Sequence, residues 1–330
     1  MLNTTFSHSD TCVCTDHSET LANGGNLALL DTLELHKKNI DSSTTATLRK
    51  RAKRKYISYG LAKKLMTLNS ELHKSYSHTL SCGSTLKQEN GKITSSYCGH
   101  RWCIVCSNIR TGKAINGYES QLEALRDPQF VTLTAVNVYD NPRDEVNRMQ
   151  KVFANINDLM KKRGFRIKGL RKLEITHGAN GFNPHYHIIM EGRIEAEMLL
   201  NEWMKRNDCN DRAQSIRKAD RGAMLELLKY STKLTAKATD ICALDAIFVA
   251  LQGKKTLQSF GGIKPVREEI TDLEATIETD QETTEIYVWH DTDWFNVETG
   301  EGLTGYTPDE LTKEIVSGYH AKHPIMTFTN

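Results

Sequence analysis

The sequence predicts an α+β fold in which an antiparallel sheet is flanked by helices. With 330 residues, of which 38% are hydrophobic and 25% charged, the chain has the composition of a globular protein with more than one structural unit. Between residues 127 and 262, strand-like and helix-like patterns follow in the order strand, helix, hairpin, helix, strand, helix, which favours this class. No stretch approaches the roughly 18 consecutive apolar residues of a membrane-spanning helix, so none is expected.

Charge is distributed unevenly along the chain. Residues 265–330 contain 15 Asp and Glu but three Lys and Arg, a local charge of −12, whereas residues 1–264 contain 40 basic and 26 acidic residues, a charge of +14. This asymmetry mildly favours a body that faces nucleic acid, followed by an acidic C-terminal region over 265–330. Two solvated surfaces of opposite sign would have the same composition.

The first 47 residues are rich in Ser, Thr, Asn and His and have weak periodicity, so 1–47 is predicted to be a disordered polar tail. The segment Met1–Asp10 lacks the apolar core of a signal peptide, and a cytoplasmic location is therefore expected. In that compartment the eight cysteines are expected to be metal ligands or free thiols rather than disulfides.

A basic helix is predicted over residues 48–75, where leucines at positions 61, 65 and 68 have helical spacing. Its first two turns are strongly basic. Such a run can neutralise several phosphates of DNA, although basic runs are also common at the solvated start of a helix. The predicted DNA-binding residues in this helix are Arg49, Lys50, Arg51, Lys53, Arg54 and Lys55.

The cysteines of residues 76–115 have the spacing of a structural zinc site. Cys98, Cys103 and Cys106 form a C-x4-C-x2-C run, and Cys82 lies upstream. Four thiolates suit tetrahedral Zn²⁺ and leave no open position for catalysis. His100 could replace Cys82 in this set, and buried free cysteines are the alternative interpretation.

The elements of residues 127–262 follow from periodicity and from turn residues. Asn180-Gly181 between two β-rich runs is a strong hairpin signal, and Gly164 is expected to end the helix before it. Strands are expected over 130–136, 167–176, 184–190 and 213–217, and helices over 143–162, 193–206, 221–236 and 240–258.

A His-x-His pair in the second hairpin strand predicts a metal site. On a strand, His185 and His187 project from one face, about 7 Å apart. The hairpin places Glu174 opposite His187 if the turn is Asn180-Gly181, or opposite His185 if the loop has six residues. Two imidazoles and one carboxylate suit catalytic Mg²⁺ or Mn²⁺. His177 is disfavoured as a ligand by strand parity, and a solvated His pair is the commoner fate of this pattern.

The predicted helix over 221–236 carries a second candidate group. Glu226, Tyr230 and Lys233 have i, i+4, i+7 spacing and would share one helical face. A phenol between a carboxylate and an ammonium is reasonable for a tyrosine nucleophile. The alternative is an amphipathic helix with an ordinary Glu–Lys pair and a half-buried Tyr.

Taken together, these motifs resemble the replication initiator proteins of rolling-circle plasmids in the HUH endonuclease superfamily, in the family that has an upstream cysteine cluster. The resemblance runs from Cys82 to Gly262. It is carried, in family order, by the cysteine run 98–106, Phe130-Val131-Thr132-Leu133-Thr134, Lys172-Leu173-Glu174-Ile175-Thr176, Asn183-Pro184-His185-Tyr186-His187 and the segment 226–233.

The resemblance implies a ferredoxin-like or RRM-like nicking domain over 127–262, preceded by the zinc segment. Tyr230 would attack the plasmid's double-strand origin, form a 5′-phosphotyrosine and free a 3′-OH primer, and Glu226 would activate the water that ends replication. His185 and His187 would hold the divalent ion, Lys233 would act in catalysis by stabilising charge at the phosphate, and Lys229 would contact the DNA. Implied partners are single-stranded or cruciform origin DNA, a bacterial helicase and a DNA polymerase, and a homodimer is compatible with it.

Other functions share parts of this pattern. A single-tyrosine transposase or relaxase would use the same chemistry, but is less consistent with the cysteine cluster and with Glu226. A zinc-stabilised DNA-binding regulator would bind without forming a covalent adduct. A metal-dependent hydrolase would cut DNA without an adduct.

Overall fold

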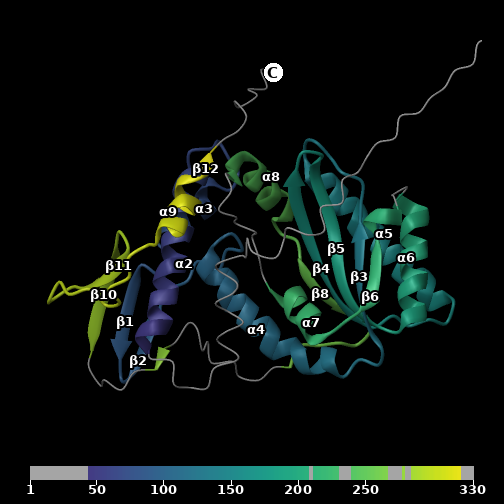
Figure 1. Cartoon of the computed structure of the whole chain (residues 1–330), viewed down its shortest axis with the longest axis horizontal. Helices are drawn as coiled ribbons and strands as arrows, with labels where there is room; N and C mark the ends of the chain where they lie inside the picture. Colours follow the sequence, from purple (N-terminus) through teal and green to yellow (C-terminus); the bar gives the residue numbers. More distant parts are fainter. Residues whose placement is uncertain (1–43, 208–210, 230–238, 267–276, 279–283, 321–330) are drawn as a thin grey trace, which may run out of the picture.

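The computed structural model describes residues 44–207, 211–229, 239–266, 277–278 and 284–320. In this part of the chain, two five-stranded antiparallel sheets stand at opposite ends of the molecule, with helices between them (Figure 1). The architecture is therefore α+β with antiparallel sheets flanked by helices, as the order of the sequence patterns predicted.

The larger sheet has the strand order β6-β3-β5-β4-β8. Its centre is the β4–β5 hairpin, whose turn is Ala179-Asn180, one residue earlier than predicted. Gly181 follows the turn at a φ of +83°, and a Cβ there would lie 2.5 Å from the Val138 carbonyl oxygen, so only glycine fits. The strands are β3 (Pro128–Thr134), β4 (Gly169–Gly178), β5 (Gly181–Glu191), β6 (Ser215–Lys218) and β8 (Leu257–Phe260).

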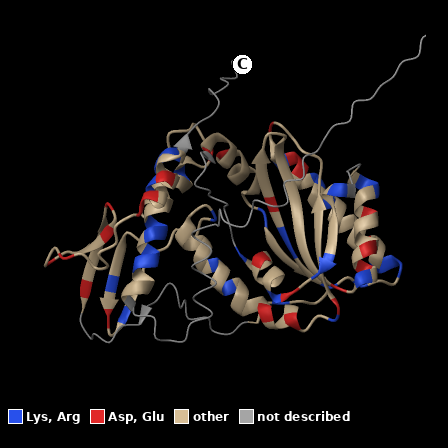
Figure 2. Cartoon of the chain, in the orientation of Figure 1, with Lys and Arg blue, Asp and Glu red and all other residues tan. Residues whose placement is uncertain are grey.

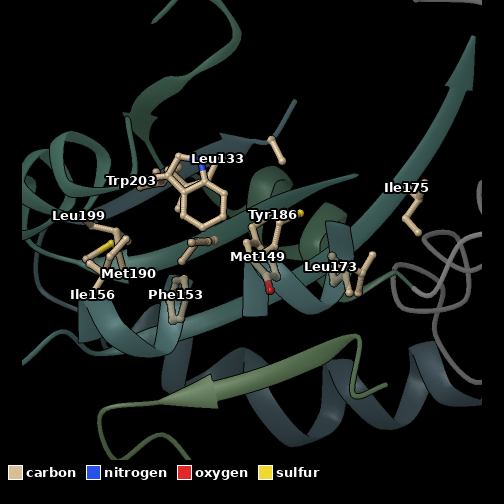
Figure 3. Packing of buried hydrophobic residues seen from close by; sticks show 14 of the residues in the cluster. Leu133, Met149, Phe153, Ile156, Leu173, Ile175, Tyr186, Met190, Leu199 and Trp203 are labelled. Atoms are coloured by element: carbon tan, nitrogen blue, oxygen red, sulfur yellow. The ribbon is translucent and has the colours of Figure 1, made fainter. Parts of the chain in front are cut away.

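One face of this sheet, the core face, packs against three helices. Alternate strand residues such as Leu133, Leu173 and Tyr186 meet the apolar stripes of these helices (Figure 3). Trp203 is fully buried, and its indole Nε1 donates to the Thr134 carbonyl at 2.9 Å, which fixes its helix to the end of β3. The helices are α5 (Pro142–Lys162), α6 (Arg193–Asn207) and α8 (Ile241–Leu251).

The opposite face, the site face, carries Phe130 and Thr132 of β3, Glu174 of β4, and His185 and His187 of β5. Only part of it is covered by an apolar cluster. That cluster joins α4 (Ile104–Glu123) and α7 (Arg221–Leu228) to the sheet through residues that include Phe130, Leu170 and Ile189. The site face is thus apolar under the two helices and polar farther along the same strands.

The smaller sheet has the order β11-β10-β1-β2-β9 and includes the acidic C-terminal region. Trp294 is fully buried between this sheet and the first helix, and its indole donates to the Gly83 carbonyl at 2.8 Å. The charge of −12 therefore belongs in part to an integral layer of the fold (Figures 1 and 2). The elements are α2 (Thr44–Leu65), α3 (His73–Leu80), β1 (Thr85–Glu89), β2 (Lys92–Ser95), β9 (Ile277–Glu278), β10 (Glu285–His290), β11 (Asp293–Asn296) and α9 (Glu310–Ser317), while β7 (Thr239–Asp240) pairs with β12 (Tyr319–His320).

Three predicted helices are shorter than expected. The basic helix ends at Leu65, and α3 is a separate helix. The helix predicted over 240–258 ends at Leu251; Gly253 then takes a φ of +70°, and the following residues form the edge strand β8. The helix predicted over 221–236 ends at Leu228, because Lys229 has the extended ψ of 121°.

Candidate functional site

The β4–β5 register brings Glu174, His185 and His187 together on the site face. Glu174 lies opposite His185, which is one of the two registers predicted. Its Oε2 is 3.6 Å from Nε2 of His185 and 3.7 Å from Nε2 of His187. One ligand atom from each side chain falls within 4.8 Å of the others. His177 is not part of this group and contacts the Phe182 ring instead, as strand parity predicted.

Neighbouring groups orient both imidazoles. Nδ1 of His185 lies 3.0 Å from the Asn183 carbonyl oxygen, which can only accept, so Nδ1 donates and Nε2 is the nitrogen that faces Glu174. Nδ1 of His187 lies 3.3 Å from the Thr132 hydroxyl. The two rings meet edge to face, with centroids 4.8 Å apart. Each Nε2 is therefore presented towards the same carboxylate.

Lys172 completes the group and was not singled out from the sequence. Its ammonium lies 2.5 Å from Oε1 of Glu174, while Oε2 faces the imidazoles. Burial raises the pKa of the Glu174 carboxyl, but Lys172 and the two histidines outweigh this effect and hold the pKa well below its usual range. The i, i+2 spacing of Lys172 and Glu174 could have revealed it, because such residues share a face of a strand.

The donor set fits a divalent ion. The low pKa of Glu174 keeps its carboxylate ionised at neutral pH, and Nε2 of both histidines lies within 3.7 Å of its Oε2. Distances of 3.6 Å and 3.7 Å between the carboxylate oxygen and the two nitrogens are compatible with binding of all three atoms to one ion. Three protein ligands would leave positions open for a phosphate oxygen and water.

The residues of the predicted tyrosine helix are only partly within the described range. Tyr230 and Lys233 lie outside it. Because α7 ends at Leu228, the i, i+4, i+7 stripe on one helix is wrong. Glu226 is on α7 with a half-exposed side chain, and it forms a 2.8 Å ion pair with Lys229, as the alternative interpretation expected. The helix nevertheless packs on the site face, so the chain leaves α7 from the face that carries the histidines.

The four predicted zinc ligands are brought together at the start of α4. Their sulfurs all lie within 4.8 Å of one another. The sulfur–sulfur distances are 3.5 Å for Cys82–Cys106 and for Cys82–Cys103, and 3.7 Å for Cys98–Cys106. A zinc ion 2.3 Å from each of four sulfurs would hold them about 3.8 Å apart, so the cluster fits tetrahedral zinc. The cluster contains Cys82 rather than His100.

Backbone amides and hydroxyls surround these sulfurs. The amide of Cys98 points at the Cys82 sulfur at 3.4 Å, and that of Gly99 at the Cys106 sulfur at 3.3 Å. The Ser58 hydroxyl donates to the Cys103 sulfur at 3.5 Å. Such donors stabilise thiolates, which are the form that binds a metal. The cluster could therefore hold an ion such as zinc and tie α3, the β1–β2 hairpin and α4 together.

The basic run of α2 is largely internal. Arg51, Arg54 and Lys55 are buried, so these three cannot serve as the exposed phosphate contacts predicted. Arg49 donates to the Thr304 carbonyl at 2.7 Å, and Lys53 pairs with Asp309 at 3.0 Å. The basic residues lie along α2 (Figure 2), but several of their side chains point towards the zinc cluster or the C-terminal region instead of solvent. The pattern of charges in the sequence does not distinguish a basic helix that faces solvent from one whose basic side chains are buried.

Comparison with known proteins adds no assignment: no family model, no curated protein and no solved structure matches the chain. Among the described residues, none of the helices has the length and apolar character that crossing a membrane requires.

Proposed function

We propose that the chain is a metal-assisted, DNA-nicking and rejoining enzyme that initiates rolling-circle replication of a plasmid. The observation that carries the proposal is the convergence of Glu174, His185 and His187 on the face of the sheet from which α7 leads towards Tyr230. The metal ligands and α7 lie far apart in the sequence but share this face of the sheet, and Tyr230 follows α7 in the sequence, outside the described residues. The larger sheet would then be of the HUH type.

The proposed reaction is a transesterification. The Tyr230 oxygen attacks the scissile phosphorus, the bond from phosphorus to the 3′ oxygen breaks, and the phenolic proton is balanced by the proton that the released 3′-OH takes up. A divalent ion bound by the two histidines and Glu174 would stabilise the charge that develops on the phosphate. The product is a 5′-phosphotyrosine and a 3′-OH from which a host polymerase extends, with a host helicase opening the duplex.

The zinc cluster has a structural part in this proposal. Four thiolates leave no open coordination position, so its contribution is to hold the first helices and α4 against the sheet. Lys229, whose side chain is 14% exposed and pairs with Glu226, is the proposed contact to the strand. Glu226 is proposed to assist hydrolysis of the final phosphotyrosine, which requires it to leave its ion pair with Lys229.

The test is formation of an SDS-stable protein–DNA adduct. The protein is incubated with labelled single-stranded origin DNA and Mn²⁺, and adduct is resolved on a denaturing gel. Tyr230→Phe should abolish adduct and nicking while binding stays near that of the wild type, because only the nucleophilic oxygen is lost. Tyr139→Phe is the matched control, since Tyr139 is 74% exposed in the loop after β3.

Each result has a distinct reading. Undiminished adduct in Tyr230→Phe would refute the assignment of the nucleophile. Wild-type cleavage without an adduct would indicate a metal-dependent hydrolase. Origin binding with neither cleavage nor adduct would indicate the zinc-stabilised regulator, and all three outcomes would overturn the proposed mechanism.

A further inference from the structure

The edge strand β6 places one cation on the site face beside the histidines. Arg217 is the cross-strand partner of Phe130, and Ser215 is the partner of Thr132, whose other neighbour is His187. Arg217 therefore projects from the same face as the proposed metal ligands, two strands away. Its sequence neighbour Lys218 alternates to the opposite face.

Arg217 is exposed and held by an aromatic ring. Its guanidinium carbon lies 4.5 Å from the centroid of the Phe130 ring. Stacking of this kind fixes the plane of a guanidinium while leaving its N–H groups free to bind an anion. Among the described residues, no carboxylate forms an ion pair with Arg217. The charge is thus oriented but not neutralised within the described part of the fold.

The same ring connects Arg217 to the histidine pair. The Phe130 and His187 centroids are 5.3 Å apart, and together with the stacking distance this places the guanidinium within about 10 Å of the His187 ring. This distance matches the spacing between nearby phosphates of a DNA strand whose scissile phosphate is bound at Glu174 and the histidines. Every side chain on this line lies on one face of adjacent strands.

We infer that Arg217 is a positioning residue that binds a backbone phosphate of single-stranded DNA as the strand crosses β6 and β3 towards the histidine–glutamate site. The inference rests on the proposed function for the identity of the ligand. An arginine favours phosphate through bidentate, charge-assisted hydrogen bonds. Because the contact is to the backbone, it would fix where the strand lies without reading its sequence.

The test measures binding without chemistry. Full-length wild type, Arg217→Ala, Arg217→Lys and Lys218→Ala are titrated with a fluorescein-labelled, mixed-sequence oligonucleotide of about 20 nucleotides, without added Mg²⁺ or Mn²⁺, over a series of salt concentrations. Arg217→Ala should weaken binding roughly tenfold at low salt and reduce the slope of log K against log[salt] by about 0.7, the value for one phosphate of a single strand. Arg217→Lys should restore the slope, and Lys218→Ala should match the wild type.

Two outcomes would overturn the inference. One is a salt slope in Arg217→Ala equal to that of the wild type, and the other is an equal loss in Lys218→Ala, which would indicate diffuse charge rather than a defined contact. Thermal unfolding of each variant shows whether it is folded, and Arg217→Gln, which removes the charge but keeps much of the side chain, takes the place of Arg217→Ala if that variant is not. Because binding is measured without the ion that cleavage needs, a missing adduct in the Mn²⁺ assay would refute the proposed function and leave this result unchanged.

Discussion

Replacement of Lys55 by methionine tests whether the basic run serves the zinc cluster rather than DNA. Lys55 is only 1% exposed, and its ammonium donates to the carbonyls of Leu80 and Cys82, at 2.6 Å and 2.7 Å, and to the Ser84 hydroxyl at 2.8 Å. These acceptors lie at the end of α3 and in the loop between α3 and β1, which carries the zinc-cluster residue Cys82. Burial lowers the pKa of Lys55 to about 8, while the four thiols act in the opposite direction.

The cost of the substitution follows from these contacts. Methionine has similar length and no donor, so the Cys82 carbonyl loses its hydrogen bond from Lys55, whereas the Leu80 carbonyl keeps one from Ser84. One orphaned buried carbonyl costs about 1–3 kcal/mol, and relief of the buried ammonium offsets part of it. A zinc ion with four thiolates would carry a net charge of −2, which the ammonium stabilises. We expect a loss of about 2 kcal/mol in the free energy of unfolding, together with weaker zinc retention.

Urea unfolding and chelator competition measure these two quantities. Lys64→Met is the matched control, because Lys64 lies on the same helix with an exposed side chain. Lys55→Met should bind non-specific DNA as the wild type does, since a buried ammonium cannot contact phosphate. If Lys55→Met has unchanged stability and zinc retention but weaker DNA binding, the reasoning is refuted and Lys55 is a DNA contact.

Two further predictions concern the site itself. His185→Ala and His187→Ala should each lower Mn²⁺ affinity at least about 100-fold in a metal titration, with a smaller effect for Glu174→Ala; unchanged affinity in both histidine variants would sink the site. Glu226→Ala should form the adduct at the wild-type rate but resolve it about 10²–10⁴-fold more slowly, giving replication products longer than one plasmid unit. Normal termination would mean that the Glu226–Lys229 pair is only a surface contact worth about 0.2–0.5 kcal/mol.

Periodicity predicted the parts of the fold in which one face of an element is buried. The apolar stripe of α5 and the alternation of β4 and β5 follow directly from their burial in one core. Strand parity was then sufficient to bring Glu174 and the His-x-His pair to the same face. The cysteine spacing likewise predicted which four sulfurs meet, because ligand geometry is local for three of them.

The sequence was less informative where contacts between distant segments determine the ends of an element or the burial of a side chain. β8 is four residues long and is stabilised by pairing with β4, which no local pattern records. The end of α7 has no glycine or proline at Lys229 to announce it. The basic run of α2 looked solvent-facing because the burial of Lys55 depends on hydrogen-bond acceptors 25 to 29 residues away in the sequence. Gly253, by contrast, was a usable stop signal for α8.

The acidic C-terminal region is part of the fold if its removal destabilises the rest of the chain, and a dispensable tail if it does not. A domain boundary at residue 265 would allow a chain that ends there to fold and bind zinc. In the structure, β10 pairs with β1, and Trp294 fills the core between the sheet and α2. Removing this layer would expose Leu86 and Ile93 and cost more than the ~3–5 kcal/mol of deleting one buried Trp. Residues 44–265 alone should therefore unfold without cooperativity and retain little zinc, whereas a zinc-loaded, cooperatively unfolding fragment would show that the acidic region is dispensable.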